Sequence, residues 1–139
     1  MVPSATSYTP LVSFLQASMA IIWLHLITAL LAIGLGLVSL LLAKGTQLHQ
    51  LMGRVWIGLM LCATLSSFLI HRVHPPEGWS WLHGLALWTL ICMGWSVVAI
   101  GQGNVGRHAN LMKGVMVGAI AAGTAALAPG RFLAGVLGY

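Results

Sequence analysis

Apolar residues gather into four long runs along the chain, and short polar or turn-forming stretches separate them. The runs cover about residues 14–43, 46–70, 81–100 and 105–127. Each run is close to the length of about 20 residues that a helix needs to cross the hydrocarbon core of a membrane. Lys44-Gly45-Thr46, Pro75-Pro76 and the glycine-rich stretch 101–104 interrupt them. The pattern therefore predicts an all-α, up-down-up-down four-helix bundle that forms one transmembrane domain over residues 1–139.

The composition places this bundle in a membrane. Hydrophobic residues make up 59% of the chain and charged residues 5%, with Glu77 as the single acid. A soluble domain carries about 25% charged residues, so this chain could not cover itself with a hydrated surface. Helices suit a bilayer because they pair their own backbone groups. Without aspartate, and without a serine or cysteine beside a base in a polar pocket, no hydrolase or transferase is indicated.

The net charge of +5 is a signal of membrane topology rather than of nucleic-acid binding. Four cations lie near the first and third links: Lys44, Arg54, Arg107 and Lys113. Two lie toward the opposite side: Arg72 and Arg131. Because cytoplasmic loops are enriched in Lys and Arg, the first side is expected to be cytoplasmic and both termini to face outward. The expected location is a bacterial inner membrane.

Four histidines repeat along the chain with nearly constant spacing. His25 and His83 are 58 residues apart, and His49 and His108 are 59 residues apart. Within each pair of neighbouring runs the two histidines are 24 and 25 residues apart. This spacing indicates an internal repeat of a two-helix unit. Ionisable side chains inside membrane spans are costly, so these residues are functional-site candidates.

Helix geometry sorts the four histidines into two levels. At a rise of about 1.5 Å per residue, the two histidines of one hairpin are separated by about 22 Å in depth. His49 and His108 then share a level near the two short turns, here the turn level, and His25 and His83 share the open level at the other end. In an up-down-up-down bundle the members of each pair stand on diagonal helices. Imidazole is an iron ligand, so each level offers a pair of ligands for haem b, giving one or two haems.

Neighbouring residues leave two interpretations open. Arg54 and Lys113 each follow a turn-level histidine by five residues, and they either hold haem propionates or extend to lipid headgroups. Small residues on the same helices, such as Gly53, Gly114 and Gly118, either permit close helix packing or also leave room for a planar cofactor.

Other chemistry-bearing residues have ordinary explanations beside functional ones. Cys62 and Cys92 are expected to be small buried hydrophobes. His71 and His74, beside the double proline, either are interfacial polar residues or serve a haem edge, an electron donor or a metal. A stripe of tryptophans on the third run suits a lipid-facing or partner-facing surface: Trp81, Trp88 and Trp95.

The chain resembles a domain-of-unknown-function family of bacterial four-helix membrane proteins. The resemblance rests on the runs Lys44 to Trp56 and Leu82 to Trp88, on Arg107-His108 and on Pro129 to Arg131. It implies a four-helix membrane fold with recurrent histidines and no assigned activity. Gln50 stands where that family more usually has a basic residue. By analogy alone, the histidine placement is similar to that of cytochrome b561, whose four-helix core holds two b haems between alternate helices.

Two classes of function follow from the sequence. The first is a b-type haem protein that passes electrons within or across the membrane, with a quinone or small reductant as a conceivable partner. The second is a non-catalytic subunit without a cofactor that packs between other subunits of a larger membrane complex. The tryptophan stripe and the apolar ending at residues 132–137 favour association with other membrane subunits in either case. Enzymatic activity, if present, is restricted to electron transfer.

Overall fold

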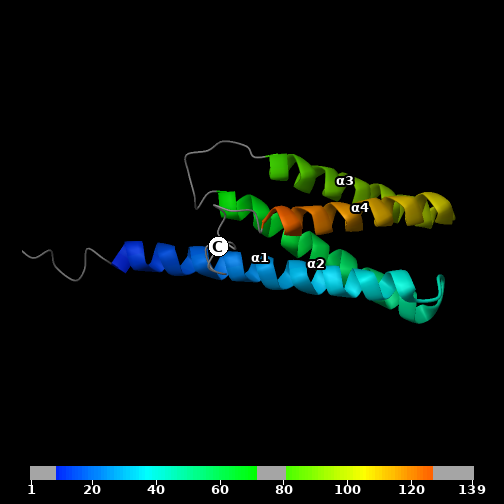
Figure 1. The fold of residues 1–139 in the computed structure, drawn as a ribbon, viewed down its shortest axis with the longest axis horizontal. Helices are drawn as coiled ribbons and strands as arrows, with labels where there is room; N and C mark the ends of the chain where they lie inside the picture. Colours follow the sequence, from blue (N-terminus) through cyan, green and yellow to red (C-terminus); the bar gives the residue numbers. More distant parts are fainter. Residues whose placement is uncertain (1–8, 72–80, 127–139) are drawn as a thin grey trace, which may run out of the picture.

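The computed structural model describes residues 9–71 and 81–126, which form four helices. In chain order these helices are α1 (Thr9–Leu41), α2 (Gln47–His71), α3 (Trp81–Gly101) and α4 (Val105–Ala125) (Figure 1). The prediction of an all-α fold is confirmed. The predicted bounds agree with α2, α3 and α4 to within two residues. The first helix begins five residues earlier than predicted, because Pro10 is compatible with the first turn of a helix.

Two short turns are built in related ways. Gly45 (φ 82°) and Gly103 (φ 75°) occupy the left-handed region that only glycine enters without strain. At the first turn Thr46 caps α2, as its Oγ1 accepts a hydrogen bond from the His49 N–H at 3.2 Å. At the second turn Asn104 caps α4 through the Arg107 N–H at 3.0 Å. These caps place a histidine within the first turn of both α2 and α4.

The first turn is also closed by side chains that bind backbone carbonyls. The Lys44 ammonium donates to the carbonyl oxygens of Ser39 and Leu40 at the end of α1, at 2.9 and 2.7 Å. The Gln50 amide donates to the carbonyl oxygen of Gly45 at 3.1 Å. Gln50 therefore stabilises the turn without a charge.

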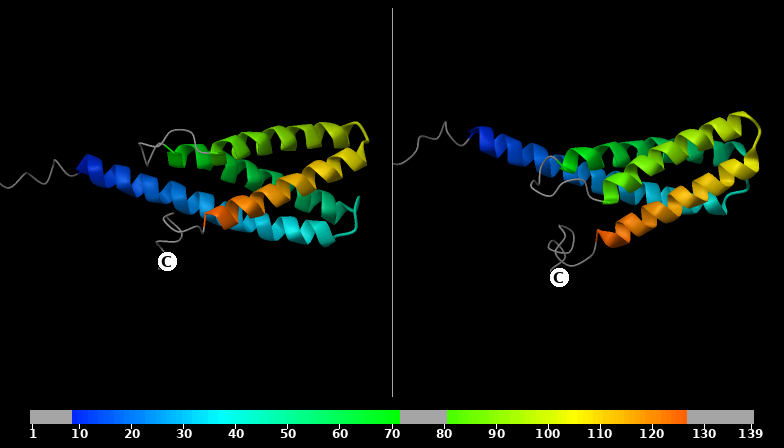
Figure 2. Two further views of the ribbon diagram at one scale, coloured as in Figure 1. Left: turned by 45° about the horizontal axis from the view of Figure 1, so that its top comes forward. Right: turned by 90° about the horizontal axis from the view of Figure 1, so that it is seen from above.

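The helices pair as two antiparallel hairpins, α1 with α2 and α3 with α4 (Figure 1). The hairpins meet through smaller contacts of α2 with α3 and of α1 with α4. Among the described residues no Cα atoms lie within 8 Å of each other across the diagonal pairs α1/α3 and α2/α4. Both short turns lie at the same end of the bundle (Figure 2). This is the predicted up-down-up-down order.

The outer surface of the bundle is apolar, as a lipid environment requires. Within residues 9–71 and 81–126, three helical segments are long and apolar enough to cross a membrane: Met19–Leu41, Gln47–Ile70 and His83–Gly101. The 21 residues of α4 do not reach this apolarity, because Arg107, Asn110 and Lys113 lie in its first half. A membrane bundle is thus confirmed, while α4 as a fourth span remains a prediction.

The core is a central layer of side chains between the two histidine levels. Its fully or nearly buried members are Ala32, Trp56, Met60, Cys92, Met93, Val115 and Met116. Gly36 of α1 lies where a Cβ would come within 2.6 Å of Trp56 Nε1 and 2.7 Å of Met116 Sδ. This close approach brings α1, α2 and α4 together at one depth. Both cysteines are free thiols, with Cys92 buried and Cys62 half-buried, in line with their expected role as small hydrophobes.

Candidate functional site

His25 is held between the two helices of the first hairpin. Its Nδ1 lies 2.8 Å from the carbonyl oxygen of Ala63 and 3.2 Å from the hydroxyl oxygen of Ser66, both on α2. Because a carbonyl oxygen can only accept, Nδ1 carries the proton and donates. In the neutral form of the ring, this tautomer leaves the lone pair on Nε2. Metal-ligating histidines commonly have this arrangement, since the Nδ1–H bond fixes the ring.

His108 is held in the same way between the helices of the second hairpin. Its Nδ1 lies 2.7 Å from the Ser96 hydroxyl and 3.1 Å from the Ser96 carbonyl oxygen. The Ser96 hydroxyl also lies 3.4 Å from the carbonyl oxygen of His108. A proton on Nδ1 satisfies all three contacts, because the Ser96 hydroxyl then accepts from the ring and donates to the backbone. Ser96 is completely buried, so this bond is shielded from lipid, and Nε2 again keeps its lone pair.

The open-level histidines lie at similar depth. His25 contacts α2 at Ala63 and Ser66, and the His83 ring lies against Phe68 of the same helix, with ring centroids 5.8 Å apart and planes inclined by 47°. Phe68 follows Ser66 by two residues and Ala63 by five, so the contacts of His25 and His83 on α2 are about 3 to 8 Å apart along its axis. His25 and His83 are therefore on diagonal helices near one level, as the spacing predicted.

The turn-level histidines are also at similar depth. Trp56 and Met116 both lie against Gly36. His49 precedes Trp56 by seven residues and His108 precedes Met116 by eight, which is about 10 and 12 Å of helix. Since α2 and α4 run in the same direction, His49 and His108 occupy nearly the same depth on diagonal helices.

The turn-level end of the first hairpin contains buried polar atoms without partners. His49 Nδ1, Ser39 Oγ and Trp56 Nε1 are each inaccessible and make no hydrogen bond within the described part of the chain. Trp56 itself is 5% exposed. Buried polar groups in proteins nearly always have a partner. These atoms therefore mark a place where a bound group or an internal water would supply the missing partners.

The donor set fits a bis-histidine haem in part. Over residues 9–71 and 81–126 no group of three or more His, Cys, Asp or Glu could hold a metal ion, but haem iron requires only two axial ligands from the protein. Two histidines have oriented rings, and one more has an unpartnered nitrogen. Arg54 and Lys113 are exposed, which is compatible with either of their predicted roles.

The structure does not describe the side chains of two histidines named in the sequence analysis, and it shows two hydrogen-bond partners of histidines that the sequence did not indicate. His74 lies outside residues 9–71 and 81–126, and the His71 side chain is likewise not described. Ser66 and Ser96 were not predicted as site residues. Only their distances from the histidines in space identify them, since they follow no spacing rule in the sequence.

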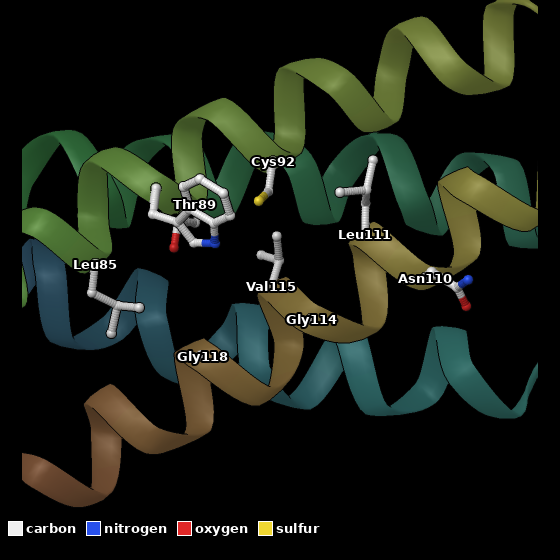
Figure 3. A pocket seen from close by; sticks show the side chains of 9 residues that line it. Leu85, Thr89, Cys92, Asn110, Leu111, Gly114, Val115 and Gly118 are labelled. Carbon is white, nitrogen blue, oxygen red and sulfur yellow. The ribbon is translucent and has the colours of Figure 1, made fainter.

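A groove runs along the outer side of the second hairpin, between α3 and α4, with a volume of about 220 Å³. Its walls are mostly apolar, and Thr89 and Asn110 contribute polar groups. Figure 3 shows Leu85 and Thr89 extending from α3 toward Gly114 and Gly118 of α4. None of the four repeated histidines lines this groove. Trp88 and Trp95 of the predicted stripe are more than half exposed on the same helix, and the Arg107 guanidinium lies 5.8 Å from the Trp95 ring.

The fold and its apolar surface define an integral membrane protein of the helical-bundle class. The family model described as "Predicted membrane protein (DUF2306)" matches residues 22–137. The chain therefore belongs to this family, which confirms the resemblance drawn from its sequence motifs. No curated protein and no solved structure matches the chain.

Proposed function

We propose that this protein binds b-type haem and passes electrons within or across the membrane. The observation that carries the proposal is the anchoring of His25 and His108 through Nδ1 to backbone carbonyls. This bond gives a histidine a fixed ring and an Nε2 lone pair, which are the properties of an axial ligand. These two histidines stand at different levels. The analogy with cytochrome b561 supports the same pairing but rests on histidine placement alone.

In this proposal each level holds one haem between diagonal helices. His25 with His83 would ligate at the open level, and His49 with His108 at the turn level. Haem supplies a one-electron carrier whose potential the protein adjusts through ligands and burial. The chain's own contribution is to orient the imidazoles, to exclude water with the central layer around Trp56 and Met116, and to offer Arg54 and Lys113 as cations for propionates.

The location and orientation belong to the same proposal. The cations at both short turns, Lys44 and Arg107 among them, support a cytoplasmic position for the turn level. Both termini would then lie outside a bacterial inner membrane. Electrons would pass between the outer face and the cytoplasmic face along the bundle.

A visible spectrum of the purified protein tests the proposal directly. The oxidised and dithionite-reduced forms should show the absorbance of a six-coordinate b-type haem, with at most two haems per chain. Absence of this absorbance in protein isolated from its native membrane would end the haem proposal. A haem that remains bound after both His25→Ala and His108→Ala would assign its ligands elsewhere.

A second candidate is a cofactor-free accessory subunit of a larger membrane complex. The exposed faces of Trp88 (58%) and Trp95 (52%) on α3 favour it, because they provide aromatic surface beyond the needs of the bundle. Native electrophoresis in mild detergent tests the association. A single species near the 14.7 kDa of the chain plus detergent would exclude a stable subunit. Loss of a larger species on changing Trp88 and Trp95, but not on changing His49, would favour the accessory role.

A further inference from the structure

The groove between α3 and α4 has an unpartnered hydroxyl at its floor. Thr89 is 7% exposed, and its side chain makes no hydrogen bond with any residue of the described ranges. Its hydroxyl is not sealed inside the protein, because Thr89 lines the groove (Figure 3). Four other buried residues with a hydroxyl have partners: Thr28, Thr64, Ser66 and Ser96. The inaccessible hydroxyl of the half-buried Ser39, near the short turn, has none among the described residues. In a membrane helix a threonine hydroxyl normally bonds the carbonyl one turn back, so Thr89 departs from the rule that its neighbours follow.

Glycines give the groove the shape of a slot. A Cβ on Gly114 would meet nothing within 4 Å, and one on Gly118 would meet only Leu85 Cδ1 at 3.6 Å. Leu85, Leu111 and Val115 provide apolar walls. The volume of about 220 Å³ is below the range of about 300–1,000 Å³ for whole drug-sized ligands. It suits a single substituted ring whose remaining part extends into the lipid.

A second polar group lies further along the slot. Asn110 is exposed, and its carboxamide has no hydrogen-bond partner among the described residues. The Ser96–His108 bond fixes the register of α3 against α4, and in this register Asn110 is about 7 Å further toward the turns than Thr89. The slot thus presents two donors at separate depths, one on α3 and one on α4. A ring with an acceptor on each side would satisfy both.

The depth of Thr89 restricts the chemistry of the occupant. Thr89 is the ninth residue of the 21 in α3, about 12 Å from one helix end and about 18 Å from the other. The ester carbonyls of phospholipids stay near the membrane surface, so they do not reach this hydroxyl. A partner helix would meet the rim of the slot, since Thr89 lies at its floor. The occupant is therefore a flat, neutral and lipophilic molecule with acceptor oxygens.

We propose that this slot binds the ring of an isoprenoid quinone. The Thr89 hydroxyl donates to one ring carbonyl, the Asn110 amide donates to the other, and the isoprenoid tail leaves between α3 and α4 into the bilayer. Trp88, which lines the slot, provides an aromatic face beside the ring. The binding stands independently of haem; only the role of the quinone as electron partner rests on the proposed function.

Binding of decylubiquinone to the full-length protein in phosphatidylcholine nanodiscs tests this inference, with quenching of tryptophan fluorescence as the readout. The wild-type protein should give saturable quenching above that of empty nanodiscs. Thr89→Val, which removes only the hydroxyl, should weaken affinity about fivefold, as expected for one hydrogen bond in a membrane. Gly114→Leu, which fills the slot, should weaken it at least about tenfold.

Matched controls separate the slot from general damage. Thr64 is as buried as Thr89, but its hydroxyl donates to the Met60 carbonyl at 2.6 Å, so Thr64→Val should leave affinity unchanged. Gly58 on α2 also has nothing within 4 Å of an added Cβ, so Gly58→Leu should bind as the wild type does. If Gly114→Leu does not fold, the difference in quinone affinity between Thr89→Val and Thr64→Val still tests whether the slot binds the quinone.

Three results would overturn the inference. The first is quenching that never saturates, and the second is a quinone affinity in both Thr89→Val and Gly114→Leu that equals that of the wild type. The third is the loss of an oligomer in Gly114→Leu while its quinone affinity stays unchanged. The last would assign the slot to a partner helix. The absorbance of the same samples distinguishes the two proposals. Slot-dependent binding without haem would remove the proposed function alone, and haem without slot-dependent binding would remove this inference alone.

Discussion

The two hairpins follow one plan but anchor different histidines. In the α1–α2 hairpin the histidine bonded to the partner helix is His25, on the first helix and at the open level. In the α3–α4 hairpin it is His108, on the second helix and at the turn level. The sequence repeat pairs His25 with His83 and His49 with His108. The anchored residues are therefore not equivalent within the repeat.

His25 and His108, which are anchored through backbone carbonyls, therefore lie at different levels. The residues that anchor them, Ala63 with Ser66 on α2 and Ser96 on α3, lie at unrelated positions of the two helices. The remaining histidines have other surroundings: His83 lies against Phe68, and His49 has a buried Nδ1 without a partner in the described ranges. A repeat in sequence thus sets depth, while packing between helices sets the orientation of each ring.

The largest expected effect is the loss of one haem at a time. In the proposed arrangement with one haem at each level, His25→Ala should remove the open-level haem and keep the other, and His108→Ala should remove the turn-level haem, because each would remove one of two axial ligands. Haem content per chain, measured from the reduced pyridine complex, should then fall by half in each variant.

His71→Ala serves as the control for the open level. Its haem content should equal that of the wild type. Loss of haem from His71→Ala together with full retention in His25→Ala would move the open-level site to the end of α2.

Labelling tests whether the two turns share one side of the membrane. Single cysteines at Gln47 and Gln102, in chains with Cys62 and Cys92 replaced by alanine, should both resist a membrane-impermeant maleimide in intact cells. A cysteine at Gly78, in the connection between α2 and α3, should react. The expectation follows from the cations near both turns. Labelling of Gln47→Cys and Gln102→Cys with protection of Gly78→Cys would reverse the orientation.

Stability should respond to the contact of α1 with α2 and α4. Gly36→Ala places a Cβ within 2.7 Å of Trp56 and Met116 side-chain atoms, so it should destabilise the protein by about 1–3 kcal/mol. Gly34→Ala is the matched control, since an added Cβ there meets nothing within 4 Å. Thermal unfolding in detergent measures both. Equal midpoints for the two variants would contradict the close approach at Gly36.

The smallest effect is expected at the serines that contact the anchored histidines. Ser96→Ala removes the oxygen nearest His108 Nδ1, at 2.7 Å, and leaves the Ser96 carbonyl at 3.1 Å. Ser66→Ala removes an oxygen 3.2 Å from His25 Nδ1 and leaves the nearer Ala63 carbonyl at 2.8 Å. Ser96→Ala should therefore cost about 1 kcal/mol of stability and Ser66→Ala less. In haem-loaded protein Ser96→Ala should shift the midpoint potential of the turn-level haem alone. A shift of the open-level haem by Ser96→Ala would contradict the assignment of levels.

Composition and the spacing of apolar runs are enough to establish the class of protein and the order of its helices. A chain with 5% charged residues cannot cover a folded surface with groups that bind water. The glycine and proline breaks between the four apolar runs leave short links, which allow few arrangements of the helices. The depth of each histidine followed as well, because helix rise converts spacing into distance. The caps at Thr46 and Asn104 used residue types that favour helix starts in any context.

The packing of the helices sets which histidine rings are oriented and where a ligand could enter. The Ser96–His108 bond, and the lack of a partner among the described residues for Trp56 Nε1 and the Thr89 hydroxyl, each depend on the rotation of one helix against another. Apolar residues cover all sides of these helices, so the sequence carries almost no signal of which face turns inward. In a bilayer, lipid and protein core are equally apolar, and close packing and hydrogen bonds between helices fix the rotation instead.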